Sequence, residues 1–323
     1  MPWAQGKQTL TRSYMQFLAP WARRVSWQEV ARYFHPSWEK VFHSVCAPVE
    51  WGLAHRDLAG IQALGIDEIS WQRGPRYLTV VYQRDADRRR LLWVGERRTV
   101  ETRRQFFDFF GPERPRQLGF ICRDLGQPYL DVIAQKASQA LHVLDRFHVS
   151  LHRNQAIDQV RAEESQELRQ KGLAPILTHR RWCLLKRPEH LRPQEEIKWA
   201  DLLKANLRTV RAYLLKEDLA QVWTWTGVRV AAKFLHRWLH RALRSRLEPV
   251  KRVARMLRDH EPLLLNWFRA NHPISSGPTE GLNNRLQLTL RKAYGFRTFR
   301  AAEVALYHTL GALPEPESTH RFC

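Results

Sequence analysis

The chain has 323 residues, of which 44% are hydrophobic and 11% aromatic, so it can bury a full core and is not a disordered chain. Lys and Arg outnumber Asp and Glu by 53 to 32, and the resulting net charge of +21 indicates a polyanionic partner such as nucleic acid. The four cysteines are too scattered for a zinc ribbon or a disulfide framework, so we expect reduced thiols and a cytoplasmic protein. No apolar run approaches the length of a membrane span, and we expect no membrane partner.

The first part of the sequence, residues 1–55, predicts a helix-turn-helix. Ser26-Trp27-Gln28-Glu29 has the pattern of a capping box at the start of a helix, and His35-Pro36 should end that helix. A second helix, capped by Ser37, would then be the recognition helix, although many helical hairpins that bind no DNA have the same pattern. The residues predicted to contact DNA at its start are Ser37, Trp38 and Lys40.

From residue 61 the hydrophobic pattern changes to that of short strands rich in β-branched and aromatic residues. Three strands come first, followed by a helix, a strand, a second helix and a fifth strand. This order predicts an α/β fold of the ribonuclease-H-like kind, with a mixed five-stranded sheet and helices on its faces. The predicted strands are 64–70, 77–83, 91–96, 118–124 and 140–148, and the helices are Val100–Phe110 and Pro128–Ala137.

The next region, residues 151–272, has apolar residues at intervals of three and four with many Arg and Lys between them, which predicts helices only. We expect it to be an all-helical insertion in the sheet domain. The catalytic core would then consist of residues 56–150 and 273–313, and residues 314–323 would be a frayed tail.

Three acids have positions typical of a metal-dependent phosphodiester site. Asp67 lies within the first strand, Asp124 ends the fourth, and Glu280 lies in the first turn of the last helix. Carboxylates from separate elements can hold two Mg²⁺ ions for attack on phosphorus, and we expect Mn²⁺ to be tolerated. Each acid also has a structural reading: a backbone contact for Asp67, a turn for Asp124, and a favourable helix-dipole charge for Glu280.

Other polar residues could support such a site. Asp145 and His148 form a D-x-x-H pair at the end of the fifth strand; Asp145 could be a fourth acid or replace Asp124, or the pair could only stabilise the junction, and we favour a supporting role. Asn284 follows Glu280 by four residues and is predicted on the same side of the helix. The basic residues expected to position phosphates are Arg285, Arg291, Lys292 and Arg297.

Five segments together resemble the ISL-three insertion-sequence family of bacterial DDE transposases. They are I-D-E-I-S with G-P-R-Y-L-T-V-V, D-R-F-H-V, R-W-C-L-L-K-R-P-E-H-L, G-P-T-E-G-L-N-N-R-L, and R-K-A-Y-G-F-R-T-F. The resemblance implies a ribonuclease-H-like core with a helical insertion before the final acid, and Asp67, Asp124 and Glu280 as the catalytic acids. The Cys-rich, zinc-ribbon-like segment with which relatives usually begin has no counterpart in this sequence.

We therefore expect a transposase that cuts DNA at insertion-sequence ends and joins a 3′-hydroxyl to target DNA. Its partners would be double-stranded DNA, namely inverted terminal repeats and target DNA, and a second copy of the chain in a dimer. Two alternatives stay open: a catalytically inactive, transposase-derived DNA-binding regulator, and a structure-specific nuclease with the same core.

Overall fold

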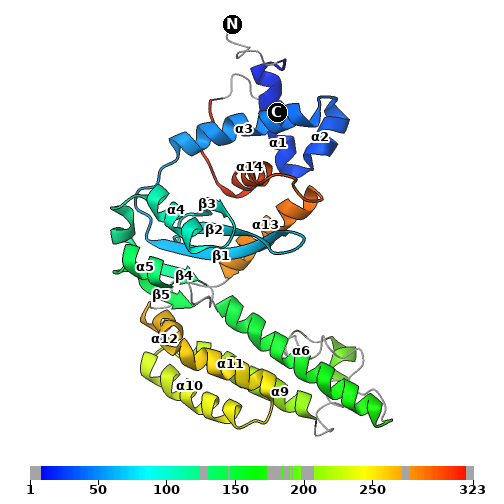
Figure 1. Ribbon diagram of the computed structural model, residues 1–323, viewed down its shortest axis with the longest axis vertical. Helices are drawn as coiled ribbons and strands as arrows, with labels where there is room; N and C mark the ends of the chain where they lie inside the picture. Colours follow the sequence, from blue (N-terminus) through cyan, green and yellow to red (C-terminus); the bar gives the residue numbers. More distant parts are fainter. Residues whose placement is uncertain are drawn as a thin grey trace. The chain divides into compact units, whose positions relative to one another are not determined.

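The protein, described by a computed structural model, divides into two compact units (Figure 1). Unit 1 comprises Met1–Leu141 and Ser275–Cys323, and unit 2 comprises His142–Ile274. The structure describes residues 9–123, 130–144, 146–172, 184, 190, 192–197, 207–270 and 277–317; for residues 123, 130, 131, 134, 147 and 277–280 it describes only the backbone. No helix in these ranges is both long and apolar enough to cross a membrane.

A mixed five-stranded sheet forms the centre of unit 1, in the order β3-β2-β1-β4-β5. The central strand β1 pairs antiparallel with β2 and parallel with β4, and β2 pairs antiparallel with β3. This arrangement confirms the predicted α/β, ribonuclease-H-like fold. The strands are β1 (Ala63–Gln72), β2 (Arg76–Arg84), β3 (Arg89–Glu96), β4 (Phe120–Arg123) and β5 (Leu141–Leu144).

One face of the sheet packs against α4 (Val100–Phe110) and α5 (Leu130–Lys136). Because side chains alternate along a strand, Leu64 and Ile66 of β1 both point to this face. They join a core that includes Phe106 and Phe110 of α4, whose rings stack at 5.3 Å between centroids. The short 3₁₀ turn η1 (Arg114–Gln117) connects α4 to β4.

The opposite face of the sheet packs against helices from both ends of the chain. Ile69 and Trp71 of β1 contact a core completed by α13 (Gly277–Lys292) and α14 (Phe299–Leu310). The buried side of α13 carries Leu282, Leu286 and Leu290, which recur with the helical period expected from the sequence. The last helices of the chain therefore cover the face of β1 that carries its odd-numbered residues from 67 onward.

The predicted helix-turn-helix is present as α2 (Trp27–Phe34) and α3 (Trp38–His55). The capping box forms as expected: the Ser26 hydroxyl accepts the Glu29 N–H, and the Glu29 carboxylate accepts the Ser26 N–H. His35 takes a left-handed conformation with φ of 62° and ends α2. A further helix, α1 (Arg12–Arg24), packs against both and was not predicted as a separate element.

After β5, whose residues 142–144 are the first of unit 2, the described secondary structure of this unit is helical, which agrees with the expected helical insertion. The helices are α6 (Arg146–Gln170), α9 (Arg208–Ala220), η4 (Gln221–Thr224), α10 (Val228–Leu243), α11 (Glu248–Asp259) and α12 (Glu261–Arg269). The fifth strand is shorter than predicted, and His148 lies in the first turn of α6 rather than at the end of a strand. Val149, Ile157 and Val160 are all buried with helical spacing, and this packing extends the helix back to Arg146.

A buried carboxylate joins two helices of unit 2. Leu207, the N-cap residue of α9, has no side chain that could bond the free N–H groups of the first turn. Glu164 of α6 accepts the N–H groups of Arg208 and Thr209, both at 2.8 Å, and the Thr209 hydroxyl at 2.6 Å. The cap of α9 thus comes from a different helix.

Replacing Glu164 with Ala should destabilise unit 2 by about 2 kcal/mol, because it removes this cap and leaves buried donors unbonded. Urea unfolding of the full chain measures the change. Glu167→Ala is the matched control: Glu167 is an exposed partner of Arg208 on the same helix, and its loss should cost less than about 0.5 kcal/mol. Equal effects of the two substitutions would contradict the capping role.

Because of His308 in α14, the stability of unit 1 should depend on pH in the acid range. Burial, together with the charges of Arg23 and Lys292, lowers the pKa of His308 to about 3. The unfolded chain takes up a proton near pH 6.5, whereas the folded chain does not, so stability should fall as the pH drops from 6.5 towards 3. At pH 5 this loss amounts to about 2 kcal/mol.

The change in unfolding free energy between pH 7.5 and 5 should accordingly be about 2 kcal/mol smaller in His308→Asn than in the unmodified chain. Urea unfolding at both pH values measures it. His43→Asn, at an exposed position of α3, should keep the original pH dependence. An unchanged dependence in His308→Asn would show that other groups are responsible.

Candidate active site

Asp67 is a buried acid in the middle of the central strand, 7% exposed, on the face covered by α13. Its Oδ1 accepts the Glu68 backbone N–H at 2.7 Å, and its Oδ2 accepts the side-chain amide of Asn283 at 2.5 Å. A carboxylate among apolar neighbours loses hydration energy, and hydrogen bonds to its charged form offset part of that cost. Neither of these two donors is charged, so neither neutralises the carboxylate.

The amide of Asn283 is itself oriented by a tyrosine. The Tyr82 hydroxyl, on β2, donates to Asn283 Oδ1 at 3.0 Å, which turns the Nδ2 group of the amide towards Asp67. Burial and the negative charge of Asp67 raise the pKa of Tyr82 well above its ordinary value. The hydroxyl therefore keeps its proton and remains the donor in a chain that runs from β2 through α13 to β1.

The neighbouring acid, Glu68, points to the opposite face of the sheet. There it forms an ion pair with Arg103 of α4, in which both side chains are largely buried. Because the period of a strand is two residues, adjacent acids are separated into different layers. Glu68 thus has a cationic partner on the α4 side, and Asp67 is the acid that faces α13.

Of the other two predicted catalytic acids, one comes directly after β4 in the sequence and the other belongs to α13, and both elements adjoin β1. In the parallel pairing of β1 with β4, Ile66 lies opposite Arg123, the last residue of β4. Asp124 is the next residue in the sequence and lies outside the described residues. The backbone of Glu280 lies in α13, three residues before Asn283, but its side chain is also outside the description. Within the described part of the chain, no group of three potential metal-binding side chains occurs.

Asn284, which was predicted to support the site, is not the asparagine that contacts Asp67. Asn284 is exposed, and the adjacent Asn283 makes that contact. The helical spacing fits both, because residues three and four positions after Glu280 lie on its side of the helix. Asp145 lies outside the described residues, and His148 belongs to α6 of unit 2.

The start of α3 has the predicted cap but little exposed basic surface. The Ser37 hydroxyl accepts the Lys40 N–H at 3.4 Å, and Trp38 is 58% exposed. Glu39 is exposed in this first turn, and further along the helix the exposed Glu50 pairs with Arg300. Because acids on this helix would repel phosphates, the exposed ring of Trp38 is the side chain of the first turn best suited to contact DNA.

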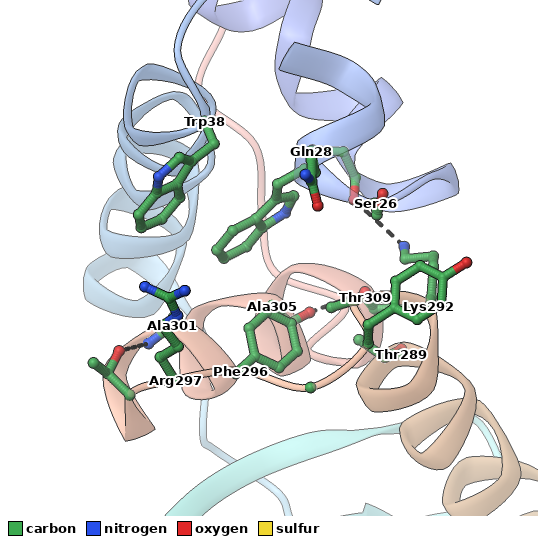
Figure 2. A pocket seen from close by; sticks show the side chains of 16 residues that line it. Ser26, Gln28, Trp38, Thr289, Lys292, Phe296, Arg297, Ala301, Ala305 and Thr309 are labelled. Carbon is green, nitrogen blue, oxygen red and sulfur yellow. Dashed lines mark hydrogen bonds between the residues drawn. The ribbon is translucent and has the colours of Figure 1, made fainter. Parts of the chain in front are cut away.

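A cleft of about 530 Å³ brings this first turn together with the segment that follows α13 (Figure 2). Trp38 and Arg297 lie on the same side of the cleft in this view, and Phe296 packs against Trp27, with ring centroids 5.5 Å apart. Residues 38 and 297, which were predicted separately as DNA contacts, thus line one cleft. Of the described residues that line the cleft, none is acidic.

The remaining predicted phosphate contacts have different surroundings. Lys292 is half-buried, and its Nζ donates to the carbonyl oxygens of Arg23 at 2.8 Å and Ala22 at 3.4 Å. Burial lowers the pKa of Lys292. Its ammonium group therefore binds the C-terminal end of α1, a position that favours a cation. Arg285 and Arg291 are exposed on α13, and Arg285 also donates to Thr309 O at 3.0 Å.

The sequence matches known proteins over most of its length. A family model described as transposase matches residues 64–306. The transposase for insertion sequence element IS1001 of Bordetella parapertussis is 29% identical over 299 residues, which cover 92% of this chain and 73% of that protein. The transposase for insertion sequence element IS1557 of Mycobacterium tuberculosis is 29% identical over 326 residues, with coverage of 93% and 72%.

The matched range includes the sheet, the helical unit and both helices that close the sheet, so it agrees with the fold described above. The chain belongs to the ISL-three family of DDE transposases.

Proposed function

We propose that this transposase cuts DNA at the ends of an insertion sequence and joins the freed 3′-hydroxyl to target DNA, in a reaction that depends on Mg²⁺. The observation that carries the proposal is the buried carboxylate of Asp67, fixed on the central strand by Asn283. Burial and two hydrogen bonds hold this acid in one orientation, as a ligand for a cation requires.

Asp67, Asp124 and Glu280 are the residues that would hold the metal. The donor chemistry fits: all three are carboxylates, and hard oxygen ligands are those that Mg²⁺ prefers. The bound ions would supply charge stabilisation for in-line attack on phosphorus.

The other residues of this network act on Asp67 rather than on the DNA. Tyr82 fixes which way the Asn283 amide faces, and Asn283 in turn fixes the carboxylate. Both are positioning residues, because neither needs to contact a phosphate to affect cleavage.

Binding of inverted terminal repeats would involve the first turn of α3 and the segment after α13. Trp38 and Arg297 both line the cleft, and Arg291 is exposed six residues before Arg297 in the sequence. Aromatic and basic groups in one place can contact both bases and phosphates. We propose that a dimer holds two element ends for the reaction.

Replacing Asp67 with Asn should abolish cleavage and joining but leave DNA affinity within about twofold, because the substitution removes a metal ligand while keeping the size of the side chain. Cleavage of a supercoiled plasmid carrying the element ends, in Mg²⁺ and in EDTA, measures the first step. A pre-cut end oligonucleotide measures joining. Glu68→Gln removes the charge of the adjacent acid and is the control. It tests whether the loss of any negative charge on β1 abolishes cleavage, and it should retain metal-dependent cleavage.

Three results would separate the alternatives. Normal strand transfer by Asp67→Asn would refute the assignment of this acid. Binding without cleavage by the unmodified chain would identify a regulator. Cleavage in Mg²⁺ without joining of the pre-cut end would identify a nuclease.

The positioning network predicts different effects for two adjacent asparagines. Asn283→Ala should lower cleavage by about 10- to 100-fold and raise the Mg²⁺ concentration needed for half-maximal rate, because Asp67 loses its orienting donor. Asn284→Ala, at an exposed position of the same helix, is the matched control and should stay within about twofold. A merely structural role of Asn283 would lower activity at every Mg²⁺ concentration without shifting the requirement.

A further inference from the structure

The exposed face of α10 in unit 2 carries a row of basic residues. Arg229, Lys233 and Arg237 recur every four residues, and Arg244 caps the C-terminal end. At 3.6 residues per turn, the four lie within an arc of about 80°. All four are exposed, whereas the opposite side of the helix packs through Ala231, Leu235, Trp238, Leu239 and Ala242.

These four cations have no acidic partner in the described part of the chain. The α10 sequence contains no Asp or Glu, and none of the four residues forms an ion pair with a described carboxylate. Two other groups at the edge of this face are paired, since Arg241 bonds Asp218 and His236 bonds Glu261. The row itself is therefore uncompensated positive charge.

The row works against the stability of its own helix. Like charges four residues apart lie next to each other on a helix surface and repel. Arg229 also lies in the first turn, where a cation opposes the helix dipole, and no acid is present there to balance it. Arg244 at the C-terminal end suits the helix dipole, but the spacing of Arg229, Lys233 and Arg237 gives the helix no such gain. A role in binding a polyanion accounts for these three residues better than stability does.

The neighbouring helix α11 also carries a row of cations, but in this row each cation has a carboxylate partner. Lys251, Arg255 and Arg258 also lie along one side of their helix, but each has a carboxylate within 4.0 Å. The partner of Lys251 and Arg255 is Glu248, and that of Arg258 is Asp259. The α11 row has three cations and the α10 row has four, and the two rows differ in whether described carboxylates compensate the charge. In Figure 1, α10 and α11 lie side by side in unit 2.

We propose that the exposed face of α10 binds the phosphate backbone of duplex DNA. The row from Arg229 to Arg244 is about 22 Å long at 1.5 Å per residue. Each DNA strand has one phosphate per roughly 3.4 Å of axis, so this length runs beside about six phosphates. The contact is to the backbone and not to bases, because long, flexible cations in a row fit repeated charge rather than base edges. The inference rests on the proposed function, since it adds a DNA-binding surface to the transposase.

The test is binding of a random-sequence duplex of about 30 base pairs to the full chain, measured by fluorescence anisotropy over a series of salt concentrations. The triple variant R229Q/K233Q/R237Q should lower affinity about tenfold or more, and the slope of log affinity against log salt should fall in magnitude by about 3. Its melting temperature should be unchanged or higher, because Gln keeps helix propensity and the repulsion is removed.

The matched control is K251Q/R255Q/R258Q, which removes three charges from the balanced row of α11. Its salt slope should stay within about one unit of the unmodified chain. Equal losses in the two triple variants, or an unchanged slope in the α10 variant, would overturn the proposal and leave overall charge as the explanation. If the unmodified chain bound no duplex at any salt concentration, the proposed function itself would fail together with this inference.

Discussion

The contact between Asn283 and Asp67 links residues 216 positions apart, and the arrangement of the candidate site depends on it. A carboxylate buried on a central strand is costly unless donors reach it. The donor comes from α13, which is held on the sheet by Leu282, Leu286 and Leu290. Apolar packing of the last helices thus determines whether an acid near the start of the core keeps its orientation.

Much of the fold could be predicted because the signals were local. Short runs rich in β-branched and aromatic residues identified β1, β2 and β3, and the capping box at Ser26 fixed the start of α2. The end of the fifth strand was predicted wrongly, because the sequence there fits both the two-residue period of a strand and the 3.6-residue period of a helix. The segment after Leu144 alternates like a strand for a few residues, but burial on the helical period from Val149 onward makes it part of α6. Such a boundary depends on packing partners that a local pattern does not contain.

The sequence indicated that Asp67 is an acid of the candidate site, but it indicated less well which residues contact the acids of β1. Strand alternation separates Asp67 from Glu68, but nothing local shows that Arg103 takes the second acid. Asn283 and Asn284 both fit the spacing from Glu280, and only the rotation of α13 on the sheet distinguishes them. Lys292 was predicted to contact DNA, yet its ammonium group binds the end of α1. The number of Lys and Arg residues in a sequence does not show which of them bind within the protein and which remain available to bind DNA.

Unit 1 is built from both ends of the chain, and this has a consequence for its synthesis. While the ribosome makes the helical unit, β1 and β2 have already emerged, but α13 and α14, which cover their apolar face, do not yet exist. That face lacks these two helices until about the last seventh of the polypeptide is translated, a period in which exposed apolar surface favours aggregation or chaperone binding. A nascent or prematurely ended product that stops before α13 lacks Asn283 and the residues beyond it, so the candidate site is complete only as translation finishes.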